Sequence, residues 1–195
     1  MDISTEAIRS LRERTGAGVM DCKTALVASG GDPDRAMTIL RERGKIRAAK
    51  KAGRVVPEGV IGVYVHNTKK VAALVSVRCE TDFVARSAPF QDLAKDLAMH
   101  VVAMDPLAVK PEGLPETLVQ EEREHLEKDG DVLGKPKKRR REIVNEKLQK
   151  ILAERALLTQ PFVKNPEITV GDLVAEKVTE FGENIVVEKC TRMVL

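Results

Sequence analysis

Cysteine and histidine are the residue types in this chain whose spacing would most readily reveal a nucleophile, a general base or a metal site. Three of each are present: Cys22, Cys79, Cys190, His66, His100 and His125. No histidine is spaced with a cysteine or a carboxylate as metal ligands are, and three widely separated cysteines form neither a zinc motif nor a disulfide framework. We therefore expect no metal site and mostly buried, reduced cysteines.

Catalytic constellations are equally sparse. Cys79 and His66 can be paired as nucleophile and base, but nothing in the sequence would orient the base. His100 lies in an apolar helical pattern, which is typical of a hydrogen-bonded core histidine. Gly16-Ala17-Gly18 lacks the preceding strand and the third glycine of a dinucleotide fingerprint. These observations favour a binding protein without a cofactor over an enzyme.

Composition disfavours several classes of partner. The 33 basic and 30 acidic residues are interspersed and leave a net charge of +3, so no global basic field would attract nucleic acid. Aromatic residues make up 3% of the chain, which disfavours stacking on single-stranded bases. No secretory signal pattern starts at Met1, and no apolar stretch has the length of a membrane span. We expect a cytoplasmic protein.

Residues 1–54 have helical periodicity throughout. The first helix places Ile3, Ala7, Ile8 and Leu11 on one face and ends at residues 15–18, which are rich in glycine. A second helix is predicted over residues 19–29. A third begins at Asp32-Pro33, an N-cap followed by a first-turn proline, and is predicted to end at Gly44. We expect a small helical domain over residues 1–54, with a basic connector at residues 45–54.

Residues 55–195 combine strands and helices. Residues 60–66 and 71–79 alternate with period two around a polar turn, which predicts a β-hairpin. Helices are predicted over residues 90–101, 117–128, 141–158 and 170–181, and a last strand over residues 185–195, with loops at residues 106–115 and 130–136. The predicted fold class is α+β: a three-helix domain over residues 1–54, and a core domain over residues 55–195 with a small antiparallel sheet flanked by helices.

Four segments along the chain carry a more specific pattern. They are Leu11–Lys23 (LRERTGAGVMDCK); Arg47–Ala52 (RAAKKA) with Glu58–Gly62 (EGVIG); Glu80–Arg86 (ETDFVAR); and Gln160–Lys164 (QPFVK) with Gly182–Val187 (GENIVV). In composition, order and spacing they resemble the elongation factor Ts family, and the first and third are the most specific. The resemblance implies guanine-nucleotide exchange on elongation factor Tu, in its GDP-bound and nucleotide-free forms, with no metal or nucleotide site in this chain.

The same resemblance implies particular site residues. The helical domain is similar to a ubiquitin-associated-type domain that docks on the partner's nucleotide-binding domain, with contact positions at Arg12, Val19, Met20 and Lys23. An exchange loop is matched by Thr81, Asp82, Phe83 and Val84. Phe83 is expected to insert near the partner's GDP-bound magnesium, and Asp82 to fix the loop or pair with the partner.

The residues themselves leave alternatives open for the two apolar anchors. Met20 follows a glycine-rich turn, and a methionine there could adapt to a partner or pack inside the helical domain. Phe83 follows polar residues after a strand, so it could be an interface hot spot or could pack beneath the next helix. A generic ubiquitin-associated-type scaffold, with residues 1–54 as its only active part, is a further alternative.

The length also bears on assembly. The chain resembles a short form of the family, for which we expect one core subdomain, no long coiled coil and a homodimer. The apolar C-terminal strand would be the pairing edge, since unpaired strand edges invite pairing. Under oxidation, Cys190 could cross-link two chains.

One basic run is not explained by the exchange function. Lys137-Lys138-Arg139-Arg140-Arg141 could belong to an RNA- or ribosome-binding accessory protein, which is the alternative function. Acidic residues are frequent in the preceding segment 121–131, which favours a solvated helix start. On balance, nucleic-acid binding is not expected from the sequence.

Overall fold

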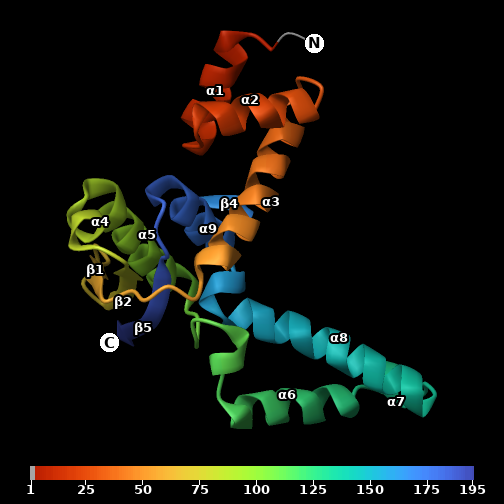
Figure 1. Ribbon diagram of the computed structural model, residues 1–195. Coiled ribbons are helices and arrows are strands. Elements are labelled where there is room, and N and C mark those ends of the chain that lie inside the picture. Colours follow the sequence, from red (N-terminus) through yellow and green to blue (C-terminus); the bar gives the residue numbers. More distant parts are fainter. Residues whose placement is uncertain (1–2) are drawn as a thin grey trace. The chain divides into compact units, whose positions relative to one another are not determined.

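The computed structural model describes residues 3–195, so Met1 and Asp2, where the signal-peptide prediction begins, lie outside the described residues. The chain combines helices with a three-stranded and a two-stranded sheet, which confirms the α+β class (Figure 1). The chain divides into two compact units: one comprises the residues up to 60 with 77–92 and 172–186, and the other comprises 61–76, 93–171 and 187–195. The division at residue 54 stays a prediction. Within residues 3–195, no helix combines the length and apolar character needed to cross a membrane.

The helical N-terminal region consists of α1 (Thr5–Thr15), α2 (Val19–Ala28) and α3 (Pro33–Lys51) (Figure 1). The Ser4 hydroxyl caps α1, Gly16 ends it with a φ of 66°, and the Asp32 carboxylate caps α3. The small core between the three helices is made of Leu11, Cys22, Ala25, Leu26 and Ala36. The predicted end of the first helix and the predicted starts of the second and third helices agree with the structure.

The prediction that Gly44 ends the third helix is wrong. Gly44 is buried within α3, and a Cβ built there would lie 3.6 Å from Thr179 Oγ1 of α9 (Val170–Phe181). An added Cβ would make only ordinary van der Waals contact there, so α3 tolerates this glycine, whose helix propensity is about 1 kcal/mol poorer than that of alanine, within a helix that packs against α9. Ion pairs of Arg41 with Glu176 and of Lys45 with Asp172 connect the same two helices.

The main sheet has the order β1 (Glu58–Val65), β2 (Val71–Cys79), β5 (Val186–Val194) and confirms the predicted hairpin and final strand. Alternate residues of β2, from Ala73 to Cys79, are buried. A Cβ at Gly62 would collide with the Ala94 carbonyl of α5 (Ala88–Met104), so β1 lies directly against this helix. The other face exposes Ile61, Val63, Val65 and Leu74.

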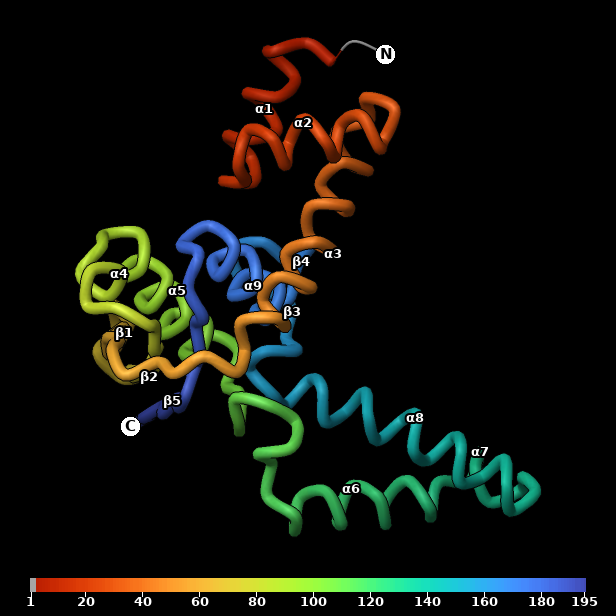
Figure 2. Tube along the Cα trace, viewed as in Figure 1, coloured from red at the N-terminus to blue at the C-terminus, as the bar shows by residue number. Residues whose placement is uncertain are grey.

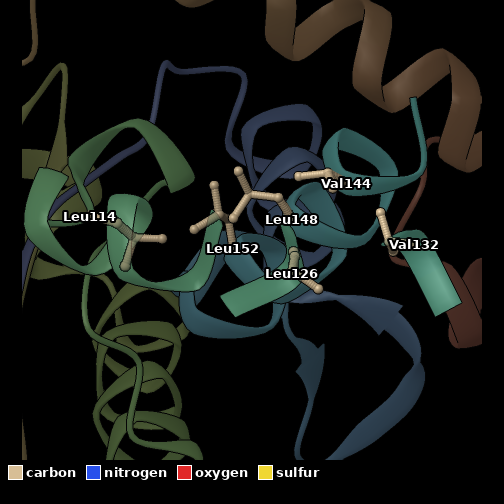
Figure 3. Packing of buried hydrophobic residues seen from close by; sticks show 6 residues of the cluster. All are labelled: Leu114, Leu126, Val132, Val144, Leu148 and Leu152. Atoms are coloured by element: carbon tan, nitrogen blue, oxygen red, sulfur yellow. The ribbon is translucent and has the colours of Figure 1, made fainter. Parts of the chain in front are cut away.

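Two charged helices pair as a hairpin, and this pairing was not predicted from the sequence. They are α6 (Glu116–Glu127) and α8 (Lys137–Arg155); Figure 2 shows them side by side, joined at one end through α7 (Gly130–Leu133). The predicted loop at residues 130–136 thus contains a helical turn capped by Asp129, and the basic run opens α8 four residues before the predicted start. The hairpin's core is formed by Leu114, Leu126, Val132, Val144, Leu148 and Leu152 (Figure 3).

Several short elements were not predicted because they lack periodicity. They are the 3-10 turns η1 (Pro111–Gly113) and η2 (Leu157–Thr159), and the paired strands β3 (Pro161–Phe162) and β4 (Asn165–Thr169). Near them, His100 of α5 is fully buried. Its Nδ1 accepts from the Val163 N–H (3.2 Å), so its Nε2–H donates to Gln160 Oε1 (3.0 Å). His100 is a hydrogen-bonded core histidine, and burial lowers its pKa.

We predict that His100 lowers the free energy of unfolding as pH falls below about 6.5. In that range the imidazole binds a proton in the unfolded state but stays neutral in the folded state. The free energy of unfolding therefore falls by at most about 1.4 kcal/mol per pH unit. Urea unfolding of wild type and His100→Gln at pH 7.5 and pH 5.5 measures this effect. The stability advantage of the wild type should shrink at the lower pH, and an advantage that is equal at both pH values would contradict the assignment.

Candidate partner-binding site

Phe83 lies in a short helix, α4 (Asp82–Arg86), which follows β2. The predicted exchange loop is therefore helical from Asp82 onward. The Thr81 side chain explains the difference, because its hydroxyl accepts from the Val84 N–H (3.3 Å) as a helix N-cap. Phe83 thus lies in the first turn of a capped helix.

The α4 helix presents one aromatic side chain and buries its opposite side. Phe83 is 83% exposed, which excludes packing beneath the next helix, whereas Val84 is 8% exposed. Val84 therefore anchors α4 and does not face a partner. Asp82 pairs with Arg86 one turn later (3.2 Å) on the exposed surface, so Asp82 braces the helix locally.

The carboxylate of Glu183 holds the start of α4. Its Oε2 accepts from the backbone N–H groups of Glu80 (3.0 Å) and Thr81 (3.1 Å), and its Oε1 accepts from the Thr81 hydroxyl (2.6 Å). The Thr81 hydroxyl accepts from Val84 and donates to Glu183, so it joins both sets of bonds. A charged acceptor with three donors is among the stronger hydrogen-bonded arrangements in proteins.

A second carboxylate extends this network to α3. Glu80 Oε1 accepts from the Asn184 N–H (2.6 Å) and lies 3.4 Å from Arg54 Nη1. The Asn184 amide in turn donates to the Arg54 carbonyl (3.0 Å), and the Lys51 ammonium donates to the Gly182 carbonyl. The bond from Asn184, aided by the charge of Arg54, lowers the pKa of Glu80. Three segments that carry the resemblance meet here, from residues 47–62, 80–86 and 182–187.

The helical N-terminal region exposes its four candidate contacts. Met20 is 71% exposed and Val19 49% exposed, and Arg12 and Lys23 are exposed as well. Packing of Met20 inside the helical domain is therefore excluded. Below them, Asp21 accepts two hydrogen bonds from the Arg47 guanidinium (2.6 and 2.8 Å), which lowers the pKa of Asp21 and fixes α2 on α3.

Some residues of the candidate site were not predicted from the sequence. Glu183, Asn184 and Arg54 lie in or beside the quoted segments, but Thr81 and Glu183 are 102 positions apart and no local signal pairs them. Val27, 56% exposed, lies seven residues after Met20 on α2 and extends its apolar surface. The seven-residue spacing was the available signal for Val27.

The described residues contain no cluster of histidine, cysteine and carboxylate side chains that could hold a metal ion. All three cysteines are free; Cys22 and Cys79 are buried, and Cys190 is partly exposed. Burial raises the pKa of each thiol, which is opposite to the activation of a nucleophile. The Cys79 thiol donates to the Thr81 carbonyl (3.2 Å).

Comparisons with known proteins agree with the quoted segments. A family model described as elongation factor TS matches residues 32–194. A relative from Rubrobacter xylanophilus, named elongation factor Ts, is 50% identical over 192 residues, 98% of each chain. Relatives of the same name from Herpetosiphon aurantiacus and Carboxydothermus hydrogenoformans are 47% and 44% identical over 98% and 99% of this chain, and the matches cover 97% and 89% of those proteins.

We predict that Glu183→Ala loosens α4, because three donors lose their shared acceptor. The free energy of unfolding should fall by about 1–3 kcal/mol, and the amides of residues 84–86 should exchange faster with deuterium. The control is Glu180→Ala, which removes a carboxylate of α9 that pairs with Lys177 (2.7 Å). Equal effects of the two substitutions would show that Glu183 has no special role.

Proposed function

This chain belongs to the elongation factor Ts family, and we propose that it accelerates the release of GDP from elongation factor Tu during translation elongation. The observation that carries the proposal is the 83% exposure of Phe83 on a helix that is capped by Thr81 and anchored by the buried Val84 and Ala85. A large aromatic side chain held out in water gains the burial of its ring on entering a partner, which outweighs the rotamer freedom that it gives up.

Two surfaces share the work in this proposal. The apolar pair Val19 and Met20, flanked by the cations Arg12 and Lys23, docks on the partner's nucleotide-binding domain. The α4 helix then brings Phe83 against the partner near its magnesium ion, which is the largest local charge holding the phosphates of GDP. Disturbing the surroundings of that ion weakens GDP binding.

The thermodynamics requires no covalent step. If this chain binds nucleotide-free elongation factor Tu more tightly than the GDP-bound form, it must weaken GDP binding by the same factor. Preferential binding of the nucleotide-free form is sufficient, so a rigid surface of complementary shape can weaken GDP binding. The Glu183 network and the buried Val84 supply that rigidity around Phe83.

We further propose that two copies of the chain pair through the exposed face of the main sheet. Ile61, Val63, Val65 and Leu74 lie on that face, and Met193 to Leu195 are exposed at the end of β5. A second copy fits this surface because a two-fold interface places the same apolar patch on both sides. Cys190 in β5 is partly exposed, which is compatible with a cross-link between copies under oxidation.

We predict that Phe83→Ala slows catalysed GDP release at least tenfold, because the variant keeps the docking surface and loses the inserted ring. Fluorescent GDP bound to elongation factor Tu is chased with unlabelled GDP in the presence of substoichiometric wild type or variant. Leu107→Ala is the control, since Leu107 is an exposed leucine (48%) outside both surfaces. Unchanged release by Phe83→Ala would contradict the role of Phe83, and no acceleration by the wild type would overturn the proposed function.

We predict that Val63→Lys shifts the protein from dimer to monomer, because a charge would be buried in the apolar sheet interface. Sedimentation velocity at several protein concentrations measures the change. Val55→Lys is the matched control at an 81% exposed valine outside the sheet. A wild type that stays monomeric throughout, or equal dissociation of both variants, would contradict the dimer.

A further inference from the structure

The end of the α6–α8 hairpin carries the whole positive surplus of the chain. We call residues 130–141 the hairpin tip; they comprise α7, the link to α8 and the first residues of α8. The tip has six basic residues and one acidic residue, hence a net charge of +5, whereas the full chain has +3. The remaining residues together are therefore slightly acidic. Such an asymmetry indicates a partner with concentrated negative charge.

Most of these cations have no carboxylate to neutralise them. Arg139 pairs with Glu142 (3.2 Å), and Arg140 donates to the Leu133 carbonyl (2.6 Å) at the end of α7. The other four make no ion pair within residues 3–195, and all four are exposed: Lys135, Lys137, Lys138 and Arg141. Their charges are available to a partner.

The basic run stands at the start of α8, where positive side chains destabilise a helix. A helix start favours acidic side chains, because its free N–H groups carry partial positive charge. The first turn of α8 has no acidic residue, and its N-cap, Pro136, offers no side-chain hydrogen bond. Helix stability therefore does not explain the run, and a bound anion would relieve the repulsion.

The hairpin holds the tip in place. Val132 of α7 is fully buried in the cluster with Val144 and Leu148 of α8 (Figure 3). Beside this cluster, Lys147 of α8 pairs with Asp129 (2.7 Å), the residue that caps α7. The cations are thus presented on a packed element with its own core.

We propose that the hairpin tip binds the phosphate backbone of structured RNA. The tip contains no aromatic residue, so it cannot stack on unpaired bases, and contact with phosphates is what its side chains can supply. An acidic protein surface fits less well, because Leu133 is the tip's one exposed large apolar side chain and no aromatic anchor accompanies it. RNA is the polyanion that surrounds a factor of translation elongation.

The experiment measures binding of the full-length protein to a fluorescently labelled RNA stem-loop by anisotropy between about 50 and 200 mM salt. Four phosphate contacts predict that the wild type loses about 100-fold in affinity over this range. The variant K137Q/K138Q/R141Q should bind at least tenfold more weakly at the lowest salt and lose only about fourfold. K137Q/K138Q should lie between the two, which keeps the test valid if the triple variant folds poorly.

A matched control removes three other exposed lysines: K95Q/K110Q/K189Q. It should bind RNA as the wild type does, and K137Q/K138Q/R141Q should still accelerate GDP release from elongation factor Tu. No RNA binding by the wild type at the lowest salt, or an equal loss in the control, would overturn the proposal. Stronger competition by polyglutamate than by unlabelled RNA of equal charge would assign the tip to an acidic protein instead. A parallel loss of GDP release would assign it to the exchange reaction.

Discussion

The three hydrogen bonds accepted by Glu183 are the interaction on which the proposed site depends. They join the end of β2 and the cap of α4 to the segment that follows α9. Without an acceptor there, two backbone N–H groups and a hydroxyl would compete for water, and α4 is too short to hold itself together. The exposure of Phe83 is tolerable because this network and the burial of Val84 fix the rest of the helix.

The same segment is also tied to α3, which packs against α1 and α2, the helices that carry the other proposed contact surface. The Lys51 ammonium donates to the Gly182 carbonyl, and the Asn184 side-chain amide donates to the Arg54 carbonyl. Both acceptors are backbone groups that any residue could supply. The helix reaches this point because it continues through Gly44, which lies against α9. A continuous α3 therefore connects the region of Met20 to the network below Phe83.

Local signals in the sequence predicted much of the fold. The cap at Asp32-Pro33, the glycine stop at Gly16 and the alternation of residues 71–79 each act over a few residues, and each was confirmed. Gly44 misled because a glycine buried inside a packed helix looks the same in sequence as one that ends a helix. Thr81 was a recognisable cap, and reading it as one would have placed Phe83 in a helix. The pairing of Thr81 with Glu183 could not be predicted, since it depends on tertiary structure across 102 positions.

The central claim is that Glu183 acts on nucleotide release through the position of Phe83. A double-mutant cycle measured by stopped-flow GDP release from elongation factor Tu, with Glu183→Gln, Phe83→Ala and both, tests it most directly. We expect Glu183→Gln to slow release in the wild-type background and to add little once Phe83 is alanine, because there is no ring left to position. Losses that add independently in the double variant would contradict the claim.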